Sequence, residues 1–233
     1  MSAEMISQLL ENASKEPARA EIPAPADRPR PEPVSALRSW DGALGYLERG
    51  MDALGGADGF ISEDREEFHP RELRRLLSFL REIGKRDLNA SRECDAAELL
   101  GVAREDLVEI AAQRRVPLLI DVAPPVGFFV IGSELDARLG LEALVLGHVA
   151  LCAPGDRLRI AVAVEEGDQT TLTAASDGRF DVDLGAFFAE EPSSAPAEGF
   201  GPAALRCGVA LLGMRREQCD LSGKERGEIK LRL

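Results

Sequence analysis

Residues 133–176 read SELDARLGLEALVLGHVALCAPGDRLRIAVAVEEGDQTTLTAAS. The first part is rich in leucine, and Ser133 stands three residues before Asp136, which is typical of the start of a capped helix. We expect this helix to run to about Cys152, because Pro154-Gly155-Asp156 then forms a turn. The second part alternates β-branched or apolar residues with others on both sides of a Glu166-Gly167-Asp168 turn. The stretch therefore predicts a helix followed by an antiparallel pair of strands, 157–166 and 169–175.

The flanking segments extend this order in both directions. Downstream, a Gly-rich loop at Gly199-Phe200-Gly201 precedes a predicted helix over 202–212 and predicted strands over 217–221 and 228–233. Upstream, the pattern predicts an amphipathic helix over 95–112, a buried strand over 117–122 and a further strand over 127–131. Together these elements indicate a C-terminal domain of the α+β class.

Composition excludes several functions. The formal charge of −13 argues against a surface for phosphate backbones or anionic lipid, which need concentrated Lys and Arg, so we expect neither nucleic-acid nor membrane binding. Cys94, Cys152, Cys207 and Cys219 lie far apart and only two histidines are present, so neither a zinc site nor a disulfide framework is predicted. With no secretory signal and no apolar stretch of about 20 residues, a cytoplasmic protein is expected.

The N-terminal region has two parts. Residues 13–33 are dense in proline, which blocks helix formation, so we expect residues 1–33 to form a disordered tail. The alternative is a docking peptide, since the pairs Met5-Ile6 and Leu9-Leu10 are spaced for a short amphipathic helix that folds on a partner.

A helical hairpin is predicted to follow the tail. The first helix has apolar residues at intervals of three and four, and the second begins near Pro70, where the ring is tolerated in the first turn. Because a lone hairpin buries little surface, it should pair with a second subunit as a four-helix bundle or fold back on the C-terminal residues. The predicted dimer interface comprises Leu37, Trp40, Leu44, Leu47, Met51 and Leu54 of the first helix and Leu73, Leu76 and Leu80 of the second.

This order of elements resembles the dimerisation and ATPase core of bacterial histidine kinases, and the related histidine phosphotransferases that keep a degenerate ATPase-like domain. The local support is LRRLL at 73–77 followed by DAAELL at 95–100, the Pro154-Gly155-Asp156-Arg157 turn, and the closing GEIKLRL at 227–233. The resemblance implies a hairpin dimerisation domain over 34–92 and a two-layer α/β sandwich of the histidine-kinase ATPase type over 93–233.

Most of the polar residues that the resemblance implies for an ATP site are replaced by other residues in this sequence. The Asn that helps to hold magnesium corresponds to His148, and imidazole is a poor ligand for that hard cation. The Asp-x-Gly-x-Gly motif for adenine corresponds to Ser176-Asp177-Gly178-Arg179-Phe180, where Asp177 could serve only after a slip of one residue. The phosphate loop corresponds to Gly199-Phe200-Gly201-Pro202-Ala203, in which Pro202 lacks an amide proton.

A kinase of this type also needs a phosphoacceptor histidine on the first bundle helix, and residues 34–54 contain none. We therefore predict a non-catalytic homodimeric adaptor without a cofactor, which binds a response regulator or another regulatory protein. One alternative is a histidine phosphotransfer protein that uses His69, beside Glu66 and Glu67. Another is an anti-sigma-like kinase that binds ATP with magnesium at His148, Asp177, Gly178, Gly199 and Gly201.

Overall fold

The computed structural model describes residues 46–50, 70–87, 89–182, 184–188 and 199–233. The chain divides into two units, Met1–Arg30 and Pro31–Leu233, and every described residue belongs to the second unit. The proline-rich tail, His69 and most of the first predicted hairpin helix lie outside the described residues. Of that helix, residues 46–50 are described and are helical.

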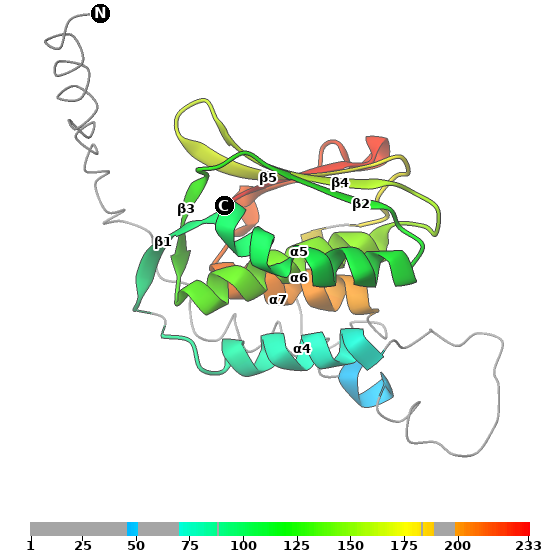
Figure 1. Ribbon diagram of the computed structural model, residues 1–233, viewed down its shortest axis with the longest axis horizontal. Coiled ribbons are helices and arrows are strands. Elements are labelled where there is room, and N and C mark those ends of the chain that lie inside the picture. Colours follow the sequence, from blue (N-terminus) through cyan, green and yellow to red (C-terminus); the bar gives the residue numbers. More distant parts are fainter. Residues whose placement is uncertain (1–45, 51–69, 88, 183, 189–198) are drawn as a thin grey trace, which may run out of the picture. The chain divides into compact units, whose positions relative to one another are not determined.

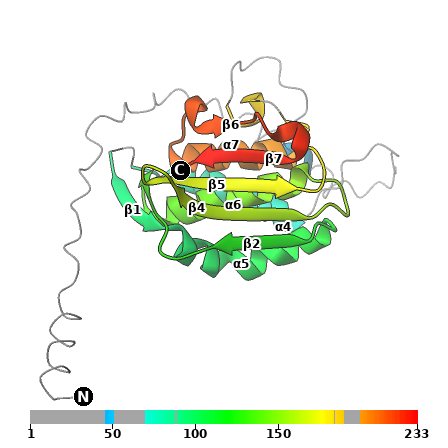
Figure 2. The same cartoon turned by 90° about the horizontal axis from the view of Figure 1, so that it is seen from above.

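The second unit is built on a five-stranded mixed sheet (Figure 2). Its order is β2 (Leu118–Val122), β4 (Leu158–Glu165), β5 (Gln169–Ser176), β7 (Glu228–Arg232) and β6 (Cys219–Asp220). β2 runs parallel to β4, and all other pairs are antiparallel. The predicted β4–β5 hairpin is confirmed, with its turn after Glu165.

Three helices cover one face of this sheet: α5 (Ala96–Gln113), α6 (Glu134–Leu151) and α7 (Phe200–Leu212) (Figure 1). The side chains of Leu158, Ile160 and Val162 are buried beneath them, whereas the intervening Arg159 is exposed. This alternation follows from the two-residue period of a strand. The α+β class and the two-layer arrangement of sheet and helices are therefore as predicted.

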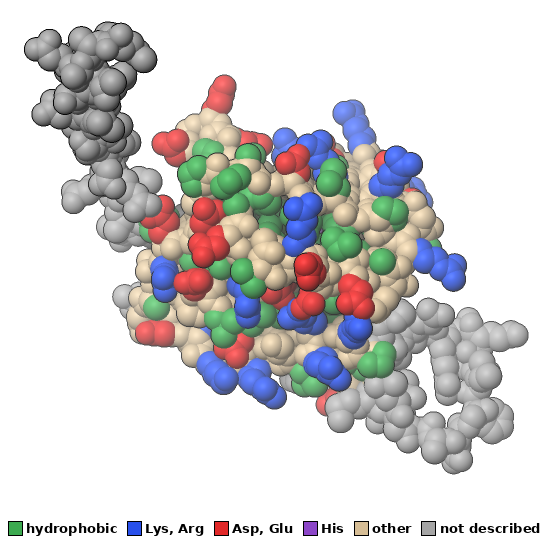
Figure 3. Space-filling view, viewed as in Figure 1, with side chains coloured by type: hydrophobic (Ala, Val, Ile, Leu, Met, Phe, Trp, Pro, Cys, Tyr) green, Lys and Arg blue, Asp and Glu red, His purple; other side chains and the backbone are tan. Residues whose placement is uncertain are grey.

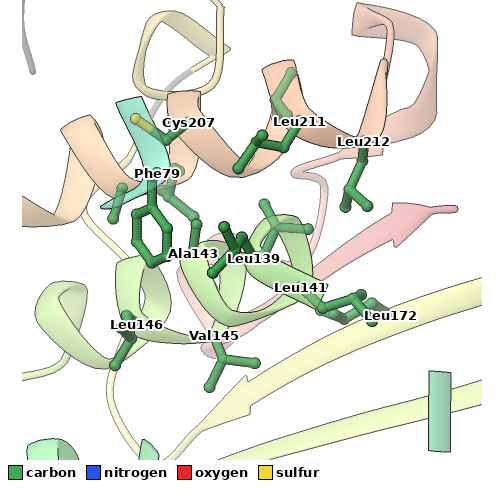
Figure 4. Close-up of a cluster of buried hydrophobic side chains, with 14 of the residues drawn as sticks. Phe79, Leu139, Leu141, Ala143, Val145, Leu146, Leu172, Cys207, Leu211 and Leu212 are labelled. Carbon is green, nitrogen blue, oxygen red and sulfur yellow. The ribbon is translucent and has the colours of Figure 1, made fainter. Parts of the chain in front are cut away.

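Close packing of α6 on α7 depends on small residues. A Cβ atom on Gly147 would lie 2.6 Å from the Leu205 side chain, and one on Gly208 would lie 2.8 Å from the Leu144 side chain. Figure 4 shows the resulting core, in which α6 side chains such as Leu139 and Ala143 face Cys207 and Leu211 of α7. Larger residues at these glycines would push the helices apart.

A fourth helix, α4 (Pro70–Ile83), lies on the side of this helix layer that faces away from the sheet (Figure 1). It packs against α7 and α6. Its apolar stripe is buried there, within the same chain: Leu73, Leu76, Phe79, Leu80 and Ile83. The second hairpin helix thus follows the alternative in which it folds back on the C-terminal residues.

This arrangement corrects part of the predicted dimer interface. Leu73, Leu76 and Leu80 are 5%, 0% and 8% exposed, so their side chains already have partners in cis. Leu47 is likewise buried in the second unit. The remaining members of the predicted interface, which are Leu37, Trp40, Leu44, Met51 and Leu54, lie outside the described residues, and their role stays a prediction.

Three smaller differences concern strands. Residues Ser91–Asp95 form β1, which the sequence did not predict, and β1 pairs antiparallel with β3 (Gly127–Ile131) in a separate two-stranded sheet. β2 lies at the edge of the main sheet and buries only Ile120 fully, so the prediction of a buried strand was wrong. The strand predicted over 217–221 is reduced to Cys219–Asp220.

Candidate functional site

The last turns of α6 form the centre of the candidate site. The helix begins with a capping box in which the Ser133 hydroxyl accepts from the Asp136 amide and the Asp136 carboxylate accepts from the Ser133 amide. This cap fixes where the helix starts and hence which residues of its last turn face inward. His148 is one of them, and its side chain is fully buried.

His148 is a neutral imidazole in an apolar environment. Its Nδ1 lies 2.6 Å from the carbonyl oxygen of Leu144, so Nδ1 carries the proton and donates it there. Burial lowers the pKa of His148 to about 4, although the hydrogen bond to Leu144 acts in the opposite direction. Nε2 is buried and has no hydrogen-bond partner in the part of the chain that the structure describes.

Two phenylalanines enclose this ring. The Phe180 ring meets it edge-on with centroids 5.9 Å apart, and the Phe187 ring lies 6.2 Å away. Both phenylalanines are 1% exposed. The segment that carries them is anchored on the loop before β7, because the Phe180 amide donates to the Lys224 carbonyl and Lys224 Nζ donates to the Val182 carbonyl. An aromatic wall therefore lies where the family resemblance implies the Asn that holds magnesium.

The end of β5 reaches the same helix through Ser176. Cys152 Sγ lies 3.6 Å from Ser176 Oγ and 3.3 Å from the His148 carbonyl oxygen. Burial raises the pKa of the Cys152 thiol, so it stays protonated and donates. Ser176 Oγ also accepts from the Gly178 amide at 3.2 Å.

Asp177 points away from this cluster. Its side chain is 68% exposed, and its closest cation is Arg157, 3.9 Å away at the surface. Gly178 is pressed against Asp156, since a Cβ atom there would lie 2.4 Å from the Asp156 carboxylate. The strand register therefore leaves Ser176 at the inward position, without the slip that would bring Asp177 to it.

The start of α7 offers few donors to an anion. Gly199 is the N-cap and has no side chain for capping, Pro202 has no amide proton, and the Ala203 amide already donates to the Gly199 carbonyl. Only the amides of Phe200 and Gly201 remain of the first helical turn. Gly201 lies against α6, because a Cβ atom there would be 3.3 Å from the Gly147 carbonyl oxygen.

A cleft of about 510 Å³ opens beside this helix start. It is lined by Tyr46, the α5 end from Gln113 to Arg115, Ala150, Cys152, Pro154 and residues 199–202. Arg114, the cation nearest to Phe200, donates two hydrogen bonds to the Glu72 carboxylate and has its guanidinium carbon 5.6 Å from the Phe200 ring centroid. Its charge is therefore already compensated by α4.

These residues do not fit magnesium-ATP. The cation prefers oxygen ligands, and the position that should supply one holds a buried imidazole. Within the described residues no cluster of three or more His, Cys, Asp or Glu side chains could hold a metal ion. Among the described helices, none has the length and apolar character of a membrane-spanning helix.

Of the predicted site residues, Gly199 and Gly201 line the cleft at the start of α7, where Gly201 lies against Gly147 and Ala150 of α6. His148 is fully buried and does not line this cleft. Asp177 and Gly178 lie at the surface end of β5, on the far side of Ser176. His69 lies outside the described residues. The sequence pattern did not predict the enclosure of His148 by Phe180 and Phe187.

Comparison with known proteins gives histidine kinases among solved structures. The chain is similar to a histidine kinase from Burkholderia phymatum STM815 (TM-score 0.43, 16% identity, 86% of this chain and 97% of that chain). It is also similar to the Acinetobacter baumannii histidine kinase AdeS (TM-score 0.46, 11% identity, 82% and 94%). A third is the histidine kinase domain of a blue-light activated histidine kinase from Erythrobacter litoralis (TM-score 0.42, 13% identity, 86% and 92%). At these scores and identities the likenesses assign no ligand, residue role or activity.

No family model and no curated protein matches the chain.

Proposed function

We propose that this protein is a non-catalytic signalling adaptor on a scaffold of histidine-kinase type, which binds a response regulator or another regulatory protein through its surface. The observation that carries the proposal is the enclosure of His148 by Phe180 and Phe187. A site that is closed by packed aromatic rings supports stability and not turnover.

Two further features support the absence of catalysis. Asp177, which follows the position that the family resemblance assigns to the adenine contact, is exposed to solvent. The helix start that would hold phosphates has lost one donor to Pro202, and its nearest arginine is bound to Glu72. Each group that would bind a nucleotide is thus replaced by another residue, exposed to solvent or already hydrogen-bonded within the chain.

The homodimer expected from the sequence remains part of the proposal. The residues of its interface are not assigned, because the apolar stripe of α4 is buried within the chain. The phosphotransfer alternative depends on His69, and no contact of the described residues favours it.

A labelling experiment separates these functions. The purified chain and its His69→Gln variant are incubated with radiolabelled ATP and magnesium, and separately with a receiver domain that was phosphorylated by labelled acetyl phosphate. An adaptor acquires no label in either reaction. Label that appears on the wild type but not on His69→Gln would indicate a phosphotransfer protein instead of an adaptor. Label that is transferred from ATP would indicate a kinase.

A further inference from the structure

The outer face of α4 carries an exposed stripe of charge and apolar surface. Arg74, Leu77 and Arg81 follow each other at intervals of three and four, so they share one side of the helix. All three are exposed, and Leu77 is 47% exposed. The opposite side of α4 is the buried stripe that packs on α6 and α7. We call the three residues the basic stripe.

The neighbouring helix α5 carries a stripe of the same form and opposite charge. Glu98, Val102 and Glu105 follow each other at intervals of four and three and are all exposed. Val102 is 69% exposed, the largest value among the exposed large apolar side chains of the described residues. We call these three residues the acidic stripe.

The four charges of the two stripes have no ion-pair partner among the described residues. Their neighbours on the same helices do: Arg71 pairs with Glu109, and Arg75 pairs with Asp106. The chain therefore pairs Arg71 and Glu109, which lie three and four residues from Arg74 and Glu105, with each other, and it leaves the four stripe charges unmatched among the described residues.

The two internal pairs also fix the direction of the helices. Position 71 meets 109 and position 75 meets 106, so sequence numbers rise along α4 while they fall along α5, and the helices are antiparallel. The spacing of the stripes matches in this orientation alone. Arg74 to Leu77 and Glu105 to Val102 are both three residues, while Leu77 to Arg81 and Val102 to Glu98 are both four residues.

We propose that these stripes form a two-fold symmetric interface between two copies of this chain. The basic stripe of each copy lies against the acidic stripe of the other, with Arg74 on Glu105, Leu77 on Val102 and Arg81 on Glu98. A two-fold axis parallel to the helices keeps α4 of one copy antiparallel to α5 of the other and makes both contacts at once. Figure 3 shows acidic side chains over α5 and basic side chains along the lower margin, where α4 lies.

The size of this face sets the strength of the pairing. With 14 and 18 residues, the two helices are about 21 and 27 Å long, and each contributes a stripe of only three residues. Such a face is small beside the roughly 800 Å² per partner of a standard interface. The pairing should therefore be weak and reversible, and it should weaken further as salt rises because its charges are exposed.

The test measures the mass of the full chain by sedimentation over a range of concentrations. The wild type should rise from 25.1 kDa towards twice that mass, and added salt should lower it. The double reversals Arg74→Glu/Arg81→Glu and Glu98→Arg/Glu105→Arg should each stay monomeric. Their equimolar mixture should form a heterodimer, since one variant then has two acidic stripes and the other two basic stripes.

Matched controls carry the same change of charge at exposed positions outside the stripes: Arg104→Glu/Arg179→Glu and Glu166→Arg/Glu217→Arg. Both should dimerise like the wild type, and circular dichroism should be the same for all variants. A wild type that stays monomeric up to about 1 mM would overturn the proposal. So would a dimer that survives both reversals, or two monomeric variants that fail to associate when mixed. None of these outcomes depends on nucleotide binding, so this proposal and the adaptor function fail separately.

Discussion

Glu72 of α4 holds Arg114 of the α5 C-terminus through two charge-assisted hydrogen bonds, one of them 2.7 Å between Arg114 Nη2 and Glu72 Oε2. The Glu72 side chain is 1% exposed, and the pair lies beside the Phe200 ring at the start of α7. One carboxylate thus ties the outermost helix to the end of α5 and neutralises the arginine at the cleft.

We expect Glu72→Ala to lower the free energy of unfolding by about 2–4 kcal/mol, because it removes one partner of a buried charge pair. Urea denaturation measures this change. The matched control is Arg71→Ala, whose pair with Glu109 is about half exposed and should contribute less than about 1 kcal/mol. Equal losses in the two variants would show that burial of the Glu72 pair has no energetic consequence.

Arg86 should anchor the other end of α4. Its guanidinium donates to the carbonyl oxygens of Ile131 at 2.6 Å and Leu211 at 3.2 Å, and also to that of Ala210. These carbonyls include the C-terminal end of α7, which needs donors. We expect Arg86→Ala to destabilise the chain by about 2–3 kcal/mol. Arg86→Lys should recover only part of the lost stability, since an ammonium group cannot reproduce the forked hydrogen bonds of a guanidinium. If urea denaturation shows complete recovery, these forked hydrogen bonds do not stabilise the chain.

His148 should make the chain sensitive to acid. The unfolded chain protonates this imidazole below its ordinary pKa of 6.5, whereas the folded chain does so only below about 4. Between these values the unfolded state binds more protons, so stability falls as the pH drops from about 6.5 to about 4 and then levels off. The total loss is on the order of 3 kcal/mol.

His148→Leu removes this contribution and should flatten the pH profile of the free energy of unfolding. Burial raises the pKa of Glu142, whose contribution has the opposite sign, but Glu142 is present in both proteins. The difference between the two profiles therefore isolates His148. A difference that stays constant between pH 7 and pH 4 would be inconsistent with a buried neutral imidazole.

The aromatic wall should be a large part of the local stability. We expect Phe180→Ala and Phe187→Ala each to cost about 3–4 kcal/mol, because each removes a fully buried ring. Phe188→Ala is the control from the same segment, and its half-buried ring should cost less. If chemical denaturation gives the same loss for all three variants, Phe180 and Phe187 do not form a packed wall around His148.

The helices could be predicted from local signals. Pro70, Asp95 and Ser133 mark the starts of α4, α5 and α6, and the Asp95 side chain accepts from the Ala97 amide as an N-cap does. β1 could not be predicted, because Ser91-Arg92-Glu93-Cys94-Asp95 has no apolar alternation and its pairing with β3 is a long-range contact.

The sequence did not predict which segment packs against each stripe of the helices. The pattern of Leu73, Leu76 and Leu80 requires an apolar partner but is the same whether that partner belongs to this chain or to another. The position of His148 in the site followed from the family resemblance, in which it corresponds to the Asn that helps to hold magnesium. Its enclosure did not, because Phe180 and Phe187 come from an irregular segment whose path depends on contacts with Lys224.

The most direct test of the account is a thermal melt of the purified chain with and without excess magnesium and ATP. A ligand at 100 times its dissociation constant stabilises the folded state by about 2.7 kcal/mol, which would be a clear rise in melting temperature. We expect no shift at millimolar ATP, either for the wild type or for His148→Asn, because Phe180 and Phe187 enclose position 148 in both. A rise in the wild type would contradict a non-catalytic adaptor and restore a nucleotide-dependent function.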